Sequence, residues 1–135
     1  MSLPITSILA GFLALLLVVL SNRVISARYK TPDSDEDKKK LEETVERRIR
    51  GQANLVEYGP MALILFALLE MQAVNMLFLT VMAVLFAFAR AVHGYAFGFT
   101  DHWKFGRLYG TMITFIVIAV LAGVAVVVGL LEGFA

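Results

Sequence analysis

The chain has 135 residues, of which 59% are hydrophobic and 17% charged, and its formal net charge is +1. An apolar share well above the roughly one half of ordinary soluble domains indicates a membrane protein, and the length suits a single domain. The small net charge excludes a global basic field for nucleic acid, and the absence of cysteine excludes disulfides, thiolate metal sites and a cysteine nucleophile. Any thiol chemistry must therefore use a thiol that a substrate brings.

Four apolar stretches follow one another along the chain. The first, about residues 3–28, is long enough to cross roughly 30 Å of hydrocarbon, and we expect it to be retained rather than cleaved. After a charged loop that contains Pro32, we expect a second helix from about Asp35 to Gln72. The expected spans two, three and four cover about residues 43–72, 75–97 and 106–131. The chain is therefore predicted to be an all-α, four-helix transmembrane bundle with one domain, residues 1–135.

The positive charges are confined to two regions. All twelve Lys and Arg residues lie either between Arg23 and Arg50 or between Arg90 and Arg107. With four spans these two regions fall on the same side, so the positive-inside rule predicts that both charged loops are cytoplasmic. We expect a multi-pass protein of the inner cell membrane in a bacterium, or of the endoplasmic reticulum in a eukaryote.

A polar stripe enters the second apolar stretch. Its members Arg47, Arg50, Asn54, Glu57 and Tyr58 fall within a sector of roughly 100° on a helix that turns about 100° per residue. Inside a membrane such a stripe is by default a hypothesis of function. The arginines would hold carboxylates, Asn54 an amide and Glu57 an ammonium, which suits a small zwitterion with several carboxylates. The alternative is that Arg50 and Glu57 only join helices through buried pairs.

The third helix carries Arg90, His93 and Phe97 on one face, at positions i, i+3 and i+7. His93 is either a hydrogen-bonded structural residue or a contact to a ligand. His93 and His102 are the two histidines of the chain, too few for a bis-histidine haem pair or a convincing zinc site, so we expect no metal.

Two cations, Lys104 and Arg107, open the fourth helix. A cation here would stabilise an anion such as a thiolate, lowering a thiol pKa from about 8.5 towards neutrality. The alternative is that both are anchors whose charged ends reach the lipid headgroups.

The spacing Arg50-x3-Asn54-x2-Glu57-Tyr58-x-Pro60, on the second of four helices, resembles the MAPEG family, the membrane-associated proteins in eicosanoid and glutathione metabolism. The resemblance covers essentially the whole chain. It extends to Ile25-Ser26-Ala27-Arg28 at the end of the first helix, to Arg90-x2-His93 on the third, and to a basic residue that opens the fourth.

The resemblance implies a homotrimer of four-helix subunits that binds glutathione between neighbours near the cytoplasmic face. It implies glutathione contacts from Arg28, Arg50, Asn54, Glu57, Tyr58, Arg90 and His93. The thiolate-stabilising arginine of the family corresponds best to Arg107, with Lys104 as the alternative. The other partners would be membrane lipid and a lipophilic electrophile dissolved in it.

The chain departs from the residue pattern of this family at two positions that bear on the reaction. Phe97 stands where the eicosanoid-forming members have tyrosine, and Ala53 lacks the extra cation of the prostaglandin-synthase branch. Both favour a general glutathione transferase, with glutathione peroxidase activity as a further option. A non-catalytic binding protein of the same fold is one alternative. A small proton-coupled multidrug exporter is a weaker one, because the first span has no acidic residue.

Overall fold

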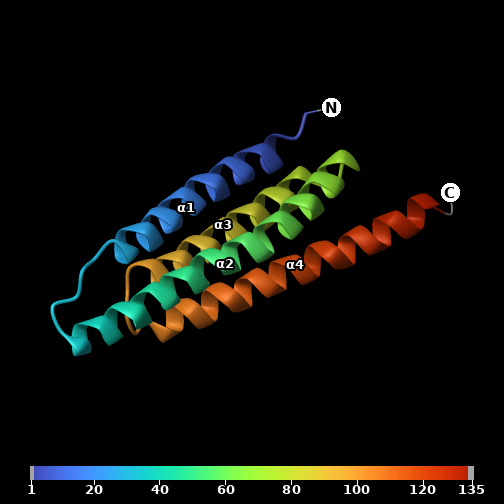
Figure 1. Cartoon of the computed structure of the whole chain (residues 1–135). Helices are drawn as coiled ribbons and strands as arrows, with labels where there is room; N and C mark the ends of the chain where they lie inside the picture. The colour runs from blue at the N-terminus through green and yellow to red at the C-terminus, as the bar shows by residue number, and fades with distance from the viewer. Residues whose placement is uncertain (1, 134–135) are drawn as a thin grey trace.

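A computed structural model describes residues 2–133, which form four α-helices joined by short connections (Figure 1). The helices are α1 (Pro4–Arg28), α2 (Asp35–Met71), α3 (Met76–Gly98) and α4 (Lys104–Gly133). Each is long and apolar enough to cross a membrane. The prediction of an all-α chain with four spans is confirmed.

The helices form an antiparallel bundle with α2 and α3 in its centre (Figure 1). Both α1 and α4 pack against this central pair, and within residues 2–133 they do not contact each other. The interior on one side is therefore enclosed by α1, α2 and α3, and on the other by α2, α3 and α4. The second of these interiors contains the polar residues considered below.

Both connections that carry charge lie at one end of the bundle, which we call the loop end (Figure 1). It contains segments 29–34 and 99–103, whereas the start of α1 and the end of α4 lie at the opposite end together with the α2–α3 turn. The two regions rich in Lys and Arg therefore come together in space, as the charge pattern predicts.

The bounds of α2 follow from local capping. Ser34 accepts a hydrogen bond on Oγ from the Asp37 amide at 3.1 Å, and three acidic residues occupy the first turn, where a helix dipole favours them. At the other end Ala73 takes a positive φ of 53°, and Asn75 Oδ1 caps α3 by accepting from the Phe78 amide at 3.0 Å. With its polar first turns capped in this way, α2 begins at Asp35, as predicted, ahead of the apolar span expected from residue 43.

A carboxylate from α2 caps the start of α1. The residue before α1, Leu3, offers no side-chain cap. Instead Glu70 Oε1 accepts from the Ile5 amide at 2.9 Å, and Glu70 Oε2 accepts from the amide and the hydroxyl of Thr6 at 2.9 and 2.7 Å. This cap fixes α1 against α2 at the end opposite the loops.

The apolar core runs along the centre of the bundle. Phe66 of α2 and Phe86 of α3 are fully buried and meet edge to face, with ring centroids 6.4 Å apart. Leucines of all four helices surround them. Gly110 of α4 lies against α3 so closely that an added Cβ would stand 2.8 Å from His93 Cβ. The absence of a side chain at Gly110 therefore brings α4 directly onto the polar residues of α3.

Candidate functional site

A buried arginine on α3 organises the polar interior. Only 1% of Arg90 is exposed. Its Nη2 donates to Asn54 Oδ1 of α2 at 2.8 Å, and its Nη1 donates to Thr114 Oγ1 of α4 at 3.4 Å. Nη2 also lies 3.4 Å from His93 Nδ1, which accepts in the tautomer that carries its proton on Nε2. Arg90 thus ties three helices together.

The charge of Arg90 has no acidic partner in the described part of the chain. The ion pairs found there involve Lys40, Arg47 and Arg50. The Nε of Arg90 is buried and has no acceptor among residues 2–133. An isolated buried cation is expensive, and an anion that enters the site would compensate it. In the single subunit the charge of Arg90 meets only neutral partners within the described residues, the side chains of Asn54, His93 and Thr114.

Thr114 was not among the predicted site residues. Its hydroxyl donates to the Gly110 carbonyl at 2.7 Å, which leaves the oxygen lone pairs free to accept from Arg90. Thr114 is fully buried. Thr114 follows Arg107 by seven residues and so lies on the same face of α4, but its partner on α3 was not predictable from this spacing.

Arg107 lies beside this polar group, on the ring of Phe97. Its Cζ is 4.6 Å from the Phe97 ring centroid, and the same ring stacks with His93 at 4.6 Å. Arg107 Nη2 donates to the Asp101 carbonyl at 3.0 Å, while its Nε is buried and finds no acceptor in the described part of the chain. The side chain points back towards the start of α4, as Cβ directions in a helix require, and so it reaches the loop rather than Thr114.

Lys104, the alternative to Arg107, is the first residue of α4 and is exposed. It has no side-chain hydrogen bond or ion pair within residues 2–133. The structure thus places Arg107, and not Lys104, in contact with the residues around Arg90.

The end of α3 is held by arginines of other helices. Arg23 Nε donates to the Gly98 carbonyl at 3.2 Å, and Arg47 Nε donates to the Phe97 carbonyl at 3.4 Å. Arg47 Nη2 also pairs with Asp101 Oδ1 at 2.6 Å. Positive charge at a helix C-terminus stabilises the exposed carbonyls there. Since α3 has no basic residue in its last turn, α1 and α2 supply it.

The polar stripe of α2 does not stay together. Arg47, Asn54 and Tyr58 turn towards α3 and α4, whereas Arg50 and Glu57 are exposed. The reason is angular: at about 100° per residue the first three lie within roughly 40° of one another, and the other two lie at the far edge of the sector. The stripe therefore has an inner part and an outer part.

The partners of the stripe differ accordingly. Tyr58 packs edge to face on Phe115 of α4, with ring centroids 5.3 Å apart. Arg50 Nη2 pairs with Glu46 Oε1 on its own helix at 2.5 Å, and both side chains are largely exposed. Within the described residues, Glu57 has no side-chain hydrogen bond or ion pair.

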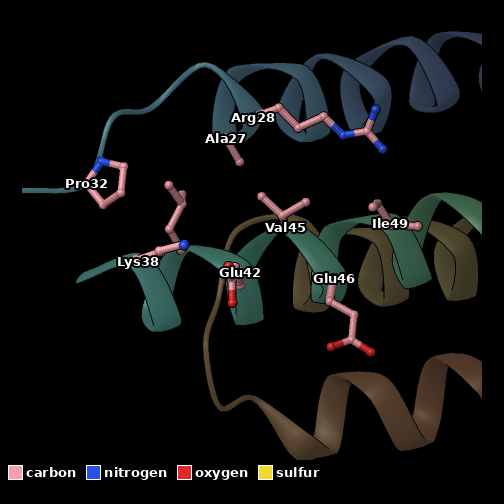
Figure 2. Close-up of a pocket in the computed structure, with 9 residues that line it drawn as sticks. Ala27, Arg28, Pro32, Lys38, Glu42, Val45, Glu46 and Ile49 are labelled. Atoms are coloured by element: carbon pink, nitrogen blue, oxygen red, sulfur yellow. The ribbon is translucent and has the colours of Figure 1, made fainter. Parts of the chain in front are cut away.

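Arg28 is separate from the buried site. It lines a groove of about 440 Å³ between the end of α1 and the first turns of α2. Figure 2 shows Ala27, Val45 and Ile49 directed into this groove, while Glu46 turns away from α1. The groove is mostly apolar and contains neither Asn54 nor Arg90. In one subunit, Arg28 and the residues around Arg90 thus form distinct surfaces.

The structure therefore groups the predicted residues into two sets. The inner set is bonded or stacked inside the bundle and consists of Asn54, Tyr58, Arg90, His93 and Arg107. The outer set is exposed and consists of Arg28, Arg50, Glu57 and Lys104. Their binding of glutathione stays a prediction.

Comparison with known proteins identifies the family. The model of the MAPEG family matches residues 6–127. No curated protein and no solved structure matches the chain significantly. The family match begins in the first turn of α1 and continues into the second half of α4, so it spans all four helices and every residue of both sets. The chain therefore belongs to the MAPEG family of membrane helical bundles.

Proposed function

We propose that the chain is a membrane glutathione transferase, which joins the thiolate of glutathione to lipophilic electrophiles dissolved in the bilayer. Membership of the MAPEG family supports a membrane role connected with glutathione or eicosanoid metabolism. The observation that carries the finer proposal is Arg90, a buried cation without an acidic partner in residues 2–133, hydrogen-bonded to Asn54 and beside His93.

Glutathione has the chemical groups that the two sets of residues require. It carries two carboxylates, one ammonium and two peptide amides. Arg90 offers a desolvated guanidinium to a carboxylate, and Asn54 and Tyr58 offer hydrogen bonds from the same side of α2. The exposed Arg50 and Glu57 offer a second guanidinium and a partner for the ammonium. Arg28 would add a further cation from α1.

The outer set supports a homotrimer with glutathione between neighbouring subunits. Glu57 and Arg50 lie on the exposed face of α2, where its apolar part begins. Charged side chains that face lipid are unfavourable, so a second copy of the chain that covers this face would shield them. The ligand would then contact the outer set directly and reach the inner set through the interface.

The reaction would begin with ionisation of the thiol, whose proton passes to water. The Arg107 guanidinium would stabilise the thiolate by a charge-assisted hydrogen bond, and its buried Nε–H lacks an acceptor in the described part of the chain. The sulfur lone pair then forms a C–S bond with the electrophilic carbon, and the leaving group departs with the bonding electrons. Because Phe97 has no hydroxyl, we propose a general transferase rather than an eicosanoid synthase.

The proposed reaction needs a water-soluble substrate and a lipid-soluble substrate to meet at the same site. Glutathione would enter from water at the loop end, which we propose faces the cytoplasm because the Lys and Arg residues are concentrated there. The electrophile would arrive through the bilayer along the apolar outer faces of the helices. A peroxidase reaction on lipid hydroperoxides is a second use of the same thiolate.

The test is calorimetric titration of the purified protein with glutathione, followed by turnover of a panel of electrophiles such as chlorodinitrobenzene. We expect saturable binding that weakens about tenfold or more in Arg50→Ala, as for loss of a charged hydrogen bond. Lys30→Ala is the matched control, because Lys30 is an exposed cation at the same end whose side chain has no ion pair in residues 2–133.

Three outcomes would contradict the proposal in different ways. No heat in the wild type would remove glutathione as the ligand. Binding without turnover of any electrophile would assign a non-catalytic binding protein. Proton-driven efflux from proteoliposomes, lost in Glu57→Gln, would assign an exporter.

A further inference from the structure

We infer that Arg47, which the candidate glutathione contacts do not include, is the positioning residue for Arg107. The inference rests on the proposed function, in which Arg107 meets the glutathione sulfur. Arg47 lies on α2 and Arg107 on α4, and no hydrogen bond joins them directly. They act on the same two residues of the loop end, Phe97 and Asp101.

Each of these two residues is held by Arg47 and in turn supports Arg107. Asp101 receives Arg47 on its carboxylate, at 2.6 Å, and Arg107 on its backbone carbonyl, at 3.0 Å. Phe97 accepts from Arg47 Nε on its carbonyl, at 3.4 Å, and presents its ring to Arg107 at 4.6 Å. Arg47 therefore fixes both the carbonyl and the ring on which the Arg107 guanidinium rests.

Of the ion pair between Arg47 and Asp101, the more buried side chain is the more rigid one. The Arg47 side chain is 16% exposed, whereas that of Asp101 is 71% exposed and lies in the connection between α3 and α4. An exposed carboxylate in a short loop would move freely without a partner, and the carbonyl of the same residue would move with it. The pair with Arg47 prevents this, because Arg47 is enclosed between α2 and the end of α3.

A second feature of α2 supports the same arrangement. One turn after Arg47 stands Gly51, which is buried against Phe97. An added Cβ at Gly51 would lie 2.5 Å from Phe97 Cβ, so α2 accepts Phe97 at this distance only because residue 51 has no side chain. The loop end of α3 is thus docked on α2 by a close backbone approach and by the Arg47 contacts together.

The effect on chemistry follows from preorganisation. A guanidinium that is already oriented stabilises a developing charge without reorganising, whereas a mobile one must first lose conformational freedom. Releasing Asp101 and Phe97 would leave Arg107 present but free to move. The thiolate would then be less stable, while the groups that hold the rest of glutathione would be unchanged.

The test separates ionisation of the bound thiol from binding. In the purified full-length protein with glutathione added, the ultraviolet absorbance of the thiolate is followed against pH, and the dissociation constant is measured by calorimetry. For Arg47→Ala we expect the thiol pKa of bound glutathione to rise by about one unit. This shift is expected because the charge-assisted hydrogen bond from Arg107 to the sulfur would form less often. At a pH below the thiol pKa of bound glutathione, where the ligand binds as the thiol, the dissociation constant should stay within about threefold of the wild-type value, a factor worth less than one neutral hydrogen bond.

Two further variants test whether Arg47 acts on Arg107 through Asp101. Asp101→Ala removes the carboxylate but retains the backbone carbonyl that Arg107 uses, so it should raise the thiol pKa as Arg47→Ala does. The double variant should be no worse than either single one, since both break one linkage. Arg47→Lys, which keeps a cation for Asp101, should recover most of the effect.

Arg48→Ala is the matched control, because Arg48 neighbours Arg47 and donates instead to the Arg23 carbonyl at 2.7 Å. Its thiol titration should equal that of the wild type. The inference is overturned if Arg47→Ala leaves the titration unchanged while Arg107→Ala raises the pKa. It is also overturned if Arg47→Ala weakens binding with an unchanged titration, since Arg47 would then contact the ligand.

Failure of the proposed function looks different, because the wild type itself would then bind no glutathione. Should Arg47→Ala not assemble, Asp101→Ala decides the question, since it changes an exposed loop residue.

Discussion

Asn54 of α2 accepts a hydrogen bond from the guanidinium of Arg90 on α3, with Oδ1 and Nη2 2.8 Å apart. It is the shortest hydrogen bond that the Arg90 side chain makes within residues 2–133. The bond joins two central helices through a residue that we propose binds the ligand. Stability of the bundle and occupancy of the site are therefore linked at this one pair.

This linkage predicts opposite effects of two substitutions at residue 54. Asn54→Ala removes the acceptor of a buried cation and should lower the free energy of unfolding by about 2 kcal/mol, the typical value for a hydrogen bond to a charged group. Asn54→Asp supplies the missing carboxylate and should raise the thermal midpoint. The added carboxylate would also occupy Arg90, so glutathione should bind more weakly to Asn54→Asp. Thermal unfolding in detergent and calorimetry check both effects; stronger binding by Asn54→Asp would contradict the assignment of Arg90.

The four-helix fold was predictable from the sequence because the number of spans depends on how apolar and charged residues are distributed along the chain. Four apolar runs and two basic regions predict four helices with both charged loops at one end, and the structure has this arrangement. The inner site was only partly predictable. Periodicity placed Asn54 and Arg90 each on a polar face, but it does not determine how α2 and α3 are rotated about their axes. That rotation separated Arg50 and Glu57 from the rest of the stripe.

Gly51 and Gly59 provide a matched pair on α2. Alanine normally favours a helix over glycine by about 1 kcal/mol. At Gly59 the new Cβ would meet only ordinary contacts at 3.9 and 4.0 Å, so Gly59→Ala should leave the thermal midpoint unchanged or raise it. At Gly51 it would collide with Phe97 Cβ at 2.5 Å, so Gly51→Ala should lower the midpoint. Equal thermal midpoints for the two variants would show that Phe97 does not pack closely against α2 at Gly51.

The cap that Glu70 gives to α1 predicts a loss of stability at the end opposite the loops. Glu70→Ala should lower the free energy of unfolding by about 1 kcal/mol, as expected for removal of a helix N-cap. Glu132→Ala is the control, because Glu132 is exposed and has one long contact, 3.4 Å from Gln72 Nε2. Reversible unfolding in mixed detergent measures both. If the two variants lose equal stability, the cap contributes nothing specific.

The Phe97 ring predicts a loss of turnover when its aromatic face is removed. Phe97→Leu should lower kcat about fivefold, the equivalent of about 1 kcal/mol for a cation–π contact to Arg107. Phe97→Tyr keeps the ring and should retain most of the turnover. Steady-state kinetics with glutathione and chlorodinitrobenzene give the comparison. Full activity in Phe97→Leu would separate the ring from the function of Arg107.

Contacts between side chains of different helices could not be predicted from the sequence. Glu70 was a polar residue at the end of an apolar run, with no signal that it accepts from the amide of Ile5, 65 positions earlier, in the first turn of α1. Arg47 belonged to the predicted stripe, yet its partner Asp101 lies in a loop of another part of the chain. Such pairs depend on which helix ends meet in space, and one sequence does not contain that information.

The most direct test of the central claim is a structure determined with glutathione bound. The account predicts a homotrimer with glutathione between subunits, a carboxylate on Arg90, and the sulfur within hydrogen-bond distance of the Arg107 guanidinium. Glutathione in the apolar groove between α1 and α2, away from Asn54 and Arg90, would contradict it.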